Sequence, residues 1–249
     1  MPIVVMTPVG AGIRGSVYHS HSFDAWATRL PGWKIVMPSN PLDAYGLMLS
    51  AIKDPNPVLF LKSKALMRVR GEELIPGEPS DEKALKAMID APIGDRSRWK
   101  AKWPELEDYS VAIGEAKTTR IGDRATIVTY GRMVLVCNKL ADDLKEQGLS
   151  IEVIDLRSLY PYDWQTVKAS IQKTGRVIFV NEDTDVTNFG EHLAYRTTTE
   201  LFYELMSRPR VVSGQNVPWI GLHPNLEDAT VPGYEQVLHE IHELIEEVP

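Results

Sequence analysis

Short apolar segments alternate with longer segments of helical periodicity from residue 111 onward, and this alternation constrains the fold more than any other feature. Strands are predicted over residues 126–130, 151–155, 176–180 and 210–213, and helices over 134–147, 163–173, 189–206 and 234–248. Strands that alternate with helices at this spacing are typical of a parallel sheet covered by helices. The sequence therefore predicts an α/β domain in this part of the chain.

The segment before residue 70 shows the same alternation. Strands are predicted over 3–6, 34–37 and 58–61, and helices over 23–30 and 41–53. Asn40 is a suitable N-cap for the second helix, and Pro41 occupies its first position, where a missing N–H costs nothing. The strand at 58–61 is continuously apolar, as in strands buried on both faces of a sheet. We expect a second parallel α/β layer here.

A segment of different composition separates the two α/β units. Between about residue 70 and residue 110, prolines and charges are frequent and only residues 81–89 have helical periodicity. Such a segment is expected to be a linker with one or two ordered turns. Trp99 and Trp103 indicate that part of it packs on a surface; the alternative interpretation is an aromatic recognition patch.

The loop over residues 7–22 is the strongest candidate for a functional site. Gly10, Gly12 and Gly15 allow backbone conformations closed to other residues and a close approach to a ligand. His19 and His21 add side chains of a type that titrates near neutral pH. The alternative is an ordinary glycine-rich connection with histidines on the surface.

Charge and cysteine content exclude several classes of protein. The net charge is −7, which argues against general binding to nucleic acids or anionic membranes, because both need a positive surface. No apolar run approaches the ~20 residues needed to span a bilayer. Cys137 is the single cysteine, so an internal disulfide is excluded and a reducing, cytoplasmic setting is expected. Its apolar surroundings in sequence favour a buried side chain over a nucleophile.

Other patterns that carry chemistry are weak or missing. The second α/β unit has no GxGxxG and no GxxxxGK[ST], so neither a dinucleotide site nor a P-loop site is supported there, and the sequence has no HExxH of a zincin site. His239 and His242 could share a metal on the last helix, but histidines on a solvated surface are the more ordinary interpretation. The polar turn over 155–163 follows a strand, where open α/β sheets place functional groups; a structural corner held by Arg157 explains it equally well.

Five segments occur in an order that is familiar from one protein family. They are residues 7–22, 31–39, 51–57, 155–161 and 173–176. Together they resemble the β subunit of the thiamine-diphosphate-dependent 2-oxoacid dehydrogenases, the decarboxylating components of the pyruvate and branched-chain complexes, which are related to transketolase. The resemblance covers nearly the whole chain. The segment from about residue 72 to residue 107 is longer than the usual connection in this family. It is similar to the segment found in family members whose α and β subunits are fused in one polypeptide.

The resemblance implies an α/β fold with two domains. Residues 1–70 would form the C-terminal half of a pyrimidine-binding domain with a parallel sheet, 71–110 a linker with an insertion, and 111–249 a three-layer C-terminal domain of the transketolase type. In the family the first domain starts further upstream, and that upstream half carries the glutamate that activates the cofactor. The chain is therefore expected to begin within this domain, and the glutamate cannot be assigned to it.

The family's functional residues match few positions in this sequence. His19 matches the active-site histidine that faces the thiazolium ring, handles the substrate carboxylate and takes part in acylation of the lipoyl group. An imidazole can donate to a developing anion and later exchange a proton, so the role is chemically reasonable. His21 stands where the family usually has glutamine, which leaves its role open.

The resemblance also implies a structural potassium site. Its ligands match Asp54 and Asn56, together with Ala51 and the backbone oxygens near Ile3 and Val4. These are the hard oxygen ligands that an alkali cation uses. Helix capping by Asp54 is an alternative explanation of that residue. The magnesium ion that holds the diphosphate is expected on the α subunit or α region, since this sequence offers no motif for it.

The implied reaction is decarboxylation of a 2-oxoacid on thiamine diphosphate, followed by transfer of the acyl group to lipoyl-lysine. The implied partners are the α subunit or α region, a second β copy and the dihydrolipoyl acyltransferase, and this chain alone is expected to be inactive. Two alternatives are a non-catalytic docking or dimerisation module that binds the acyltransferase core, and another enzyme of the transketolase family, such as a deoxyxylulose-phosphate synthase.

Overall fold

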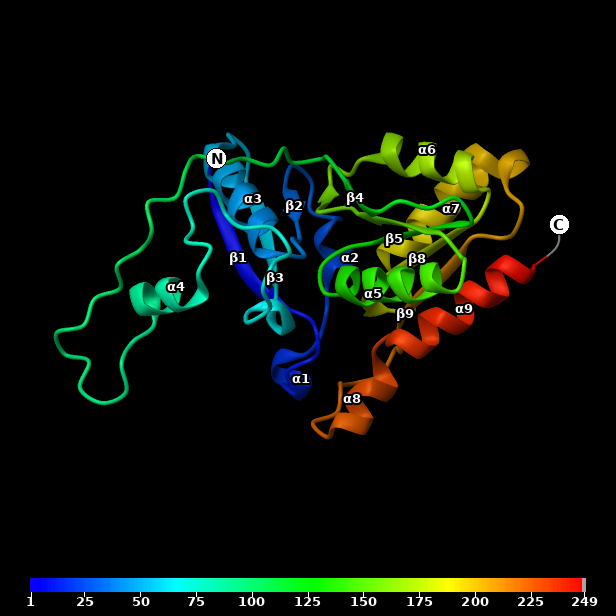
Figure 1. The fold of residues 1–249 in the computed structure, drawn as a ribbon. Coiled ribbons are helices and arrows are strands. Elements are labelled where there is room, and N and C mark those ends of the chain that lie inside the picture. Colours follow the sequence, from blue (N-terminus) through cyan, green and yellow to red (C-terminus); the bar gives the residue numbers. More distant parts are fainter. Residues whose placement is uncertain (248–249) are drawn as a thin grey trace.

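Two β-sheets that share part of their core form the framework of the protein (Figure 1). The computed structural model describes residues 1–247, so the end of the helix predicted over 234–248 lies outside the described residues. The first sheet has four strands and the second has five. The predicted α/β class is confirmed.

The N-terminal sheet has the strand order β1-β3-β2-β7. Its strands are β1 (Val4–Val9), β3 (Val58–Ser63), β2 (Lys34–Val36) and β7 (Ser158–Tyr160). The first three are parallel, whereas β7 runs antiparallel to β2. The helix α3 (Pro41–Lys53) covers one face, and Asn40 caps it by accepting a hydrogen bond from the Asp43 N–H, as predicted.

The C-terminal sheet has the strand order β4-β6-β5-β8-β9. Its strands are β4 (Lys117–Arg120), β6 (Ile151–Asp155), β5 (Ala125–Thr129), β8 (Val177–Thr184) and β9 (Arg210–Gly214). All neighbours are parallel except β4, which pairs antiparallel with β6 at one edge. The strands β5 and β6 are buried along their whole length, as expected for strands covered on both faces.

Helices cover both faces of the C-terminal sheet and give it three layers. On one face lie α5 (Met133–Glu146) and α9 (Tyr234–Glu246), and on the other lie α6 (Trp164–Thr174) and α7 (Phe189–Leu201), which continues as the 3₁₀ turn η2 (Phe202–Glu204). Side chains of β8 alternate between the two faces: Ile178 packs with α5 and α9, whereas Phe179 packs with α6 and α7. This arrangement matches the predicted three-layer domain.

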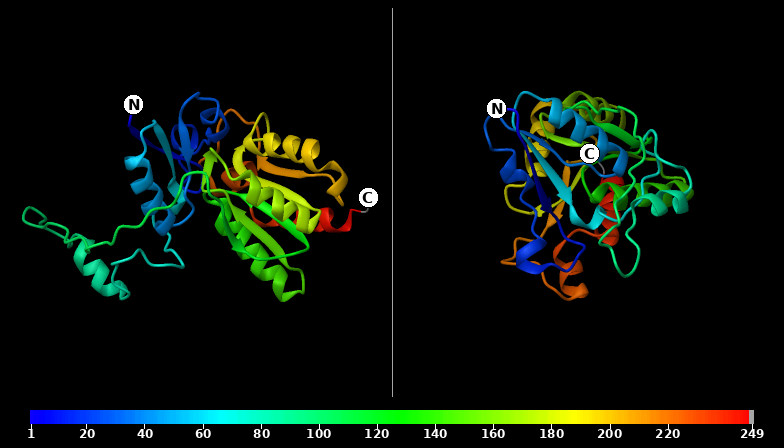
Figure 2. Two further views of the ribbon diagram at one scale, coloured as in Figure 1. Left: turned by 90° about the horizontal axis from the view of Figure 1, so that it is seen from above. Right: turned by 90° about the vertical axis from the view of Figure 1, so that its left-hand side faces the viewer.

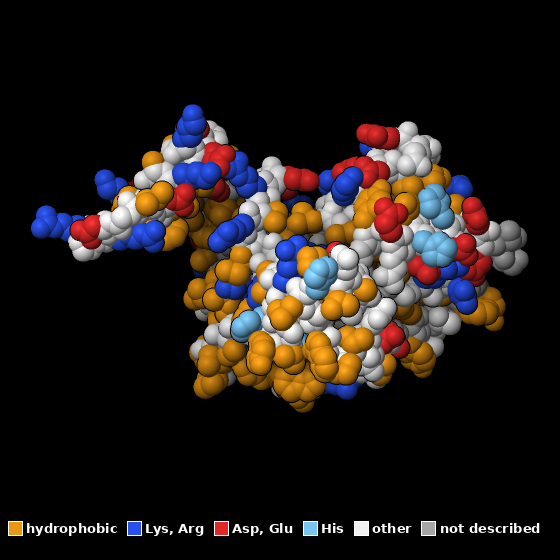
Figure 3. Space-filling model, turned by 90° about the horizontal axis from the view of Figure 1, so that it is seen from below, with side chains coloured by type: hydrophobic (Ala, Val, Ile, Leu, Met, Phe, Trp, Pro, Cys, Tyr) orange, Lys and Arg blue, Asp and Glu red, His pale blue; other side chains and the backbone are white. Residues whose placement is uncertain are grey.

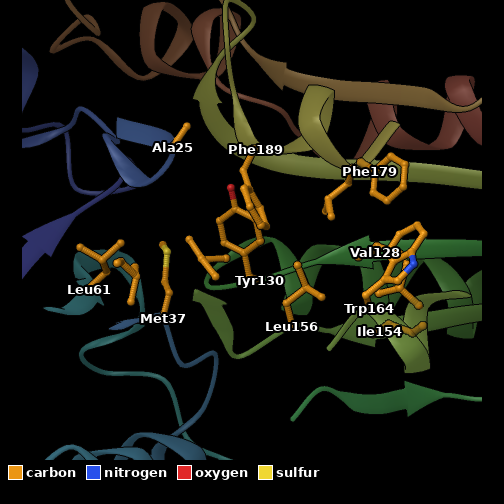
Figure 4. Packing of buried hydrophobic residues seen from close by; sticks show 14 of the residues in the cluster. Ala25, Met37, Leu61, Val128, Tyr130, Ile154, Leu156, Trp164, Phe179 and Phe189 are labelled. Carbon is orange, nitrogen blue, oxygen red and sulfur yellow. The ribbon is translucent and has the colours of Figure 1, made fainter. Parts of the chain in front are cut away.

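One hydrophobic cluster joins the two sheets. It contains Met37 and Leu61 from the N-terminal part of the chain together with Tyr130, Leu156 and Phe189 from the C-terminal part, and Figure 4 shows these side chains meeting between the two. Because the cluster is continuous, the two domains are expected to unfold as one cooperative unit.

The segment between the domains forms an arm that projects from the body (Figures 1 and 2). It follows the short turn η1 (Lys64–Leu66) and carries α4 (Glu82–Ile89), which has no buried residue. Trp99 is partly buried, whereas Trp103 is exposed. The base of the arm is tied to the body, since the Tyr45 hydroxyl donates to the Glu107 carbonyl at 2.9 Å.

Several short elements differ from the predictions. The helix predicted over 23–30 is only the single turn α2 (Asp24–Ala27), because the chain then makes a tight turn through Gly32 at φ +81°. The strand predicted over 3–6 continues to Val9, within the predicted loop. The antiparallel strands β4 and β7 and the helices α1 (Ser16–His19) and α8 (Pro224–Thr230) were not predicted. No helix in the described part of the chain is both long enough and apolar enough to cross a membrane.

Candidate functional site

His19 is the last residue of α1, a single helical turn at the end of the glycine-rich loop. The side chain is exposed, and its ring makes no hydrogen bond to any of residues 1–247. Among residues 1–247, its one aromatic neighbour is the exposed Tyr18, with ring centroids 6.4 Å apart. His21 is half-buried, and its backbone carbonyl accepts from the Gly10 N–H at 3.2 Å. The structure therefore leaves the His19 imidazole free to meet another molecule.

The three glycines of this loop serve different purposes. Gly10 and Gly12 have φ of +85° and +88°, conformations that other residues rarely adopt. Gly15 has an ordinary φ of −88°, but a Cβ there would lie 2.6 Å from the Cβ of His19. The positive φ angles near it belong to Arg14 at 57° and Ser16 at 53°. A backbone of this kind needs support from its surroundings, and loops with such strain are frequent at functional sites.

A buried carboxylate from the C-terminal domain binds the loop. One oxygen of Glu227, in α8, accepts hydrogen bonds from the backbone N–H groups of Gly12 at 2.9 Å and Arg14 at 3.1 Å. Glu227 is 4% exposed. In Figure 1, α8 and α1 lie close together at the same end of the molecule.

Two further carboxylates, at the end of β8, contact the N-terminal segment. Asp183 accepts a hydrogen bond from the Ala25 N–H, at the start of α2, at 2.9 Å. Glu182 forms an ion pair with Arg132 at 2.8 Å. Its other oxygen lies 3.0 Å from the position that a Cβ on Gly10 would occupy, so a side chain there would crowd this carboxylate in addition to straining the backbone. The carboxyl end of β8 therefore lies against the first part of the loop and binds the start of α2, which follows the loop.

A buried hydrogen bond joins Asp24 to Tyr130. The Tyr130 hydroxyl donates to the Asp24 carboxyl group, and both side chains are almost fully buried. Burial, with a smaller contribution from the nearby charge of Asp183, raises the pKa of Asp24 to about 8. The same burial raises the pKa of the Tyr130 hydroxyl above its usual value. The Asp24 carboxyl group therefore holds its proton more tightly than an exposed carboxyl group does.

The polar turn after β6 is a structural corner between the domains. Arg157 donates to Asp43 of α3 at 3.0 Å and to the Glu115 carbonyl at 3.1 Å. The Ser39 hydroxyl donates to Asp155, and burial raises the pKa of Asp155 to about 7. These contacts favour the structural explanation of this turn over a catalytic one.

Asp54 and Asn56, which were expected to bind potassium, lie close together in the loop between α3 and β3. One oxygen of Asp54 accepts from the backbone and side-chain N–H groups of Asn56 at 2.9 and 3.0 Å. Its other oxygen is paired with the Lys34 ammonium group. Asp54 follows the last residue of α3, so its carboxylate does not cap the start of a helix. Both carboxylate oxygens already bind other groups of the protein, so a cation here would depend on amide and backbone oxygens.

The remaining expected ligands lie in the adjoining backbone. The Ile3 carbonyl accepts from the Val58 N–H at 2.9 Å, and the Ala51 carbonyl accepts from the Asp54 N–H at 3.4 Å. Val4 is the first residue of β1 and is paired with Val58. A carbonyl oxygen has a second lone pair, so these groups can still face a cation.

The other reactive side chains have structural surroundings. Cys137 is fully buried in α5, and burial raises the pKa of its thiol, so it is not a nucleophile. His239 is exposed and His242 is half-buried on α9. Across residues 1–247, three or more His, Cys, Asp or Glu side chains do not come together in a way that could hold a metal ion.

Exposed hydrophobic side chains surround the His19 loop and the free edge of β1. Figure 3, which views the end carrying α1 and α8, shows hydrophobic side chains gathered along one edge of this face. The exposed large hydrophobic residues between positions 3 and 26 are Ile3, Val5, Met6, Ile13, Val17, Tyr18 and Trp26. Exposed apolar surface of this extent is typical of an interface.

His19 was proposed from the sequence, whereas the carboxylates that contact its loop were not. Glu182 and Asp183 stand at the carboxyl end of a predicted strand, and this position was the available signal. Glu227 had no comparable signal, because it lies in a short helix far from the loop in sequence.

Comparison with known proteins places both domains in one family. Residues 1–70 match the transketolase pyrimidine-binding domain, and residues 114–237 match the transketolase C-terminal domain. Two solved structures share the fold. A split-gene transketolase, an inactive β4 tetramer, has a TM-score of 0.68 over 97% of this chain and 66% of its own, at 16% identity. A Pichia stipitis transketolase mutant has a TM-score of 0.53 over 98% and 30%, at 14% identity.

Curated relatives are more similar in sequence. The 2-oxoisovalerate dehydrogenase subunit beta of Bacillus subtilis is 33% identical over 98% of this chain and 66% of its own length. The corresponding subunit of Pseudomonas aeruginosa is 36% identical over 88% and 58%. The pyruvate dehydrogenase E1 component subunit beta of Rhizobium meliloti is 33% identical over 95% and 45%. The chain thus spans about half to two thirds of the length of these relatives. It belongs to the transketolase family, as a relative of the β subunits of the 2-oxoacid dehydrogenases.

Proposed function

We propose that this chain supplies the β side of a 2-oxoacid dehydrogenase. The complete enzyme would decarboxylate pyruvate or a branched-chain 2-oxoacid with thiamine diphosphate and transfer the acyl group to a lipoyl-lysine. The observation that carries the proposal is the continuous similarity to dehydrogenase β subunits along nearly the whole chain. Relatives of both substrate types are similar to the same extent, which supports the 2-oxoacid class rather than one acid.

The residues near His19 fit one part of a shared thiamine site. Val17 and Tyr18 are exposed apolar neighbours that suit contact with an aromatic ring, whereas the sequence offers no motif for the magnesium ion that holds the diphosphate. The diphosphate and its magnesium ion are therefore assigned to the α subunit or α region. Thiamine diphosphate, when bound, supplies the carbon nucleophile for the keto group.

In this proposal His19 is the catalytic residue of the chain. Its imidazole would donate a hydrogen bond to the negative charge that develops on the substrate and would later exchange a proton there. Its exposed position and its freedom from hydrogen bonds within residues 1–247 support this role.

Substitution of His19 tests the role. We expect His19→Ala to lower 2-oxoacid decarboxylation and lipoyl acylation by the assembled enzyme by about 10²–10⁴-fold, the usual contribution of a general acid–base group. His239→Ala, on the exposed side of α9, is the control and should retain full activity. Undiminished turnover by the His19 variant would show that the histidine has no catalytic role.

The assembled wild-type enzyme separates the alternatives. Turnover of a 2-oxoacid that requires thiamine diphosphate and yields acyl-lipoyl product supports the dehydrogenase. Binding to the acyltransferase without turnover of any 2-oxoacid would favour a docking module. Synthesis of a sugar phosphate would favour another transketolase relative.

The proposal further includes the α subunit, a second β copy and the dihydrolipoyl acyltransferase as partners, and a cytoplasmic location.

A potassium ion at the corner of α3 and β3 is a further part of the proposal. The carbonyls of Ile3, Val4 and Ala51 and the side-chain oxygen of Asn56 would bind it, while Asp54 holds the Asn56 amide in place. We expect Tm to be higher in potassium chloride than in choline chloride at equal ionic strength, and Asn56→Ala to remove the difference. Equal Tm values in the two salts would exclude the site.

A further inference from the structure

The loop that carries His19 is held from the opposite domain by a residue to which the proposed reaction gives no role. Glu227 lies in α8, 215 residues after Gly12 in the chain, and is almost completely buried. One of its carboxylate oxygens accepts from the Gly12 and Arg14 N–H groups at 2.9 and 3.1 Å. Hydrogen bonds of this kind to a carboxylate are stronger than bonds between neutral groups.

The backbone of the loop explains why both N–H groups reach the same oxygen. Gly12 has φ +88° and Arg14 has φ +57°, and such conformations can turn the N–H groups of two residues that are two positions apart toward one side, as in an anion-binding nest. A glycine-rich loop with a free nest would suit a phosphate. Here the nest is filled by Glu227, so its role is to hold the loop rather than to bind a ligand.

The contact is transmitted directly to His19. Arg14 is followed by Gly15, whose N–H donates to the Ser20 hydroxyl at 2.9 Å, and the short helix between them ends at His19. Gly15 also lies so close to His19 that no side chain fits between them. A shift of Gly12 and Arg14 would therefore move the imidazole.

Apolar packing holds the same segments together. Ala11, Ile220 and Val231 form a small buried cluster that places the region around α8 against the loop. Apolar packing in this cluster is not directional, whereas the hydrogen bonds to the Glu227 carboxylate fix the orientation of two particular N–H groups.

We propose that Glu227 is a positioning residue, which orients the His19 loop for the reaction without touching the substrate. The inference rests on the proposed function, since positioning matters only if His19 is catalytic. In this proposal the C-terminal domain contributes a positioning residue to the active site of the first domain.

Steady-state kinetics of the assembled enzyme test the proposal. We expect Glu227→Ala to lower kcat by about 10²-fold, the effect of a misplaced catalytic group, with little change in KM for the 2-oxoacid. Glu227→Gln retains an oxygen acceptor and should lose less. Asp228→Asn is the matched control, because Asp228 is an exposed acid in the same helix, and it should match the wild type.

A double-substitution cycle separates positioning from general destabilisation. If Glu227 acts through His19, Glu227→Ala should reduce kcat no further in a His19→Ala background. Effects that multiply in the double variant would overturn the proposal, since they would mean that Glu227 acts independently of His19.

Amide hydrogen exchange gives a readout that does not depend on activity. In Glu227→Ala and Glu227→Gln we expect faster exchange at residues 12–19, with unchanged protection of β5 and β6. Unchanged exchange at 12–19 would overturn the proposal, and so would an equal loss of protection in β5 and β6 in both variants. If His19→Ala is fully active while Glu227→Ala still loosens the loop, the proposed catalytic role fails and the contact is structural only.

Discussion

At the level of single residues, the protein buries carboxyl groups whose pKa values are raised. Burial raises the pKa of Asp24 to about 8 and of Asp155 to about 7, while both groups would ionise near pH 4 in an unfolded chain. Between these values the folded state binds more protons than the unfolded state. The contribution of these two groups to the free energy of unfolding should therefore be full below about pH 4 and should be lost as pH rises through about 7 and 8.

Asp24→Asn tests this explanation, because asparagine keeps the shape and cannot ionise. We expect the urea midpoint of the wild type to fall between pH 5 and pH 8 and that of the variant to fall less steeply. Asp95→Asn is the control, since Asp95 is exposed in the arm and its pKa is lowered, so it titrates below this range. The same slope in the wild type and the Asp24 variant would contradict the account.

At the level of elements, long periodic segments could be predicted from the sequence and short ones could not. The helices α5, α6 and α9 have clear apolar faces, and Asp163 and Gly175 cap the two ends of α6. By contrast, β4 and β7 are short antiparallel strands whose formation depends on pairing with a neighbour far away in sequence. Such pairing leaves no periodic signal in the segment itself.

The glycines that end α5 and α6 provide a matched pair of variants. Gly148 and Gly175 both have positive φ, but a Cβ on Gly148 meets nothing within 4 Å, whereas one on Gly175 would lie 2.6 Å from Met206. We expect Gly148→Ala to cost about 1 kcal/mol from backbone strain alone. Gly175→Ala should cost a further ~1–3 kcal/mol from overpacking. Equal losses in the free energy of unfolding would show that the Met206 contact has no effect.

At the level of the whole molecule, β7 and the Arg157 corner join the two domains. The chain leaves the C-terminal sheet after β6, adds β7 to the N-terminal sheet and places Arg157 on Asp43 in the interior. The boundaries at 1–70 and 111–249 were predicted from composition and resemblance. These boundaries did not indicate that a strand from the C-terminal part of the chain joins the N-terminal sheet, because a three-residue strand resembles a turn in sequence.

Removal of the arginine should destabilise both domains together. Arg157→Met leaves Asp43 buried without its charged partner, which is expected to cost ~3–5 kcal/mol in a single unfolding transition. The double variant Asp43→Asn with Arg157→Met removes both charges and should recover part of the loss. Two separate unfolding transitions in the wild type, or a loss below ~1 kcal/mol in Arg157→Met, would contradict the role of this ion pair.

The candidate site shows the same difference between local and distant contacts. His19 was proposed because one short loop combines glycines and histidines, and the family resemblance assigned it a role. Glu182 and Asp183 had only a general signal, their position at the carboxyl end of a strand, and Glu227 had none, because all three contact the N-terminal segment from the other domain.

A structure of the assembled enzyme with thiamine diphosphate bound tests the central claim most directly. The account predicts that the His19 ring contacts the cofactor, with heavy atoms within about 4 Å, while Glu227 still binds Gly12 and Arg14. A cofactor bound at a site that the His19 ring does not reach would contradict it.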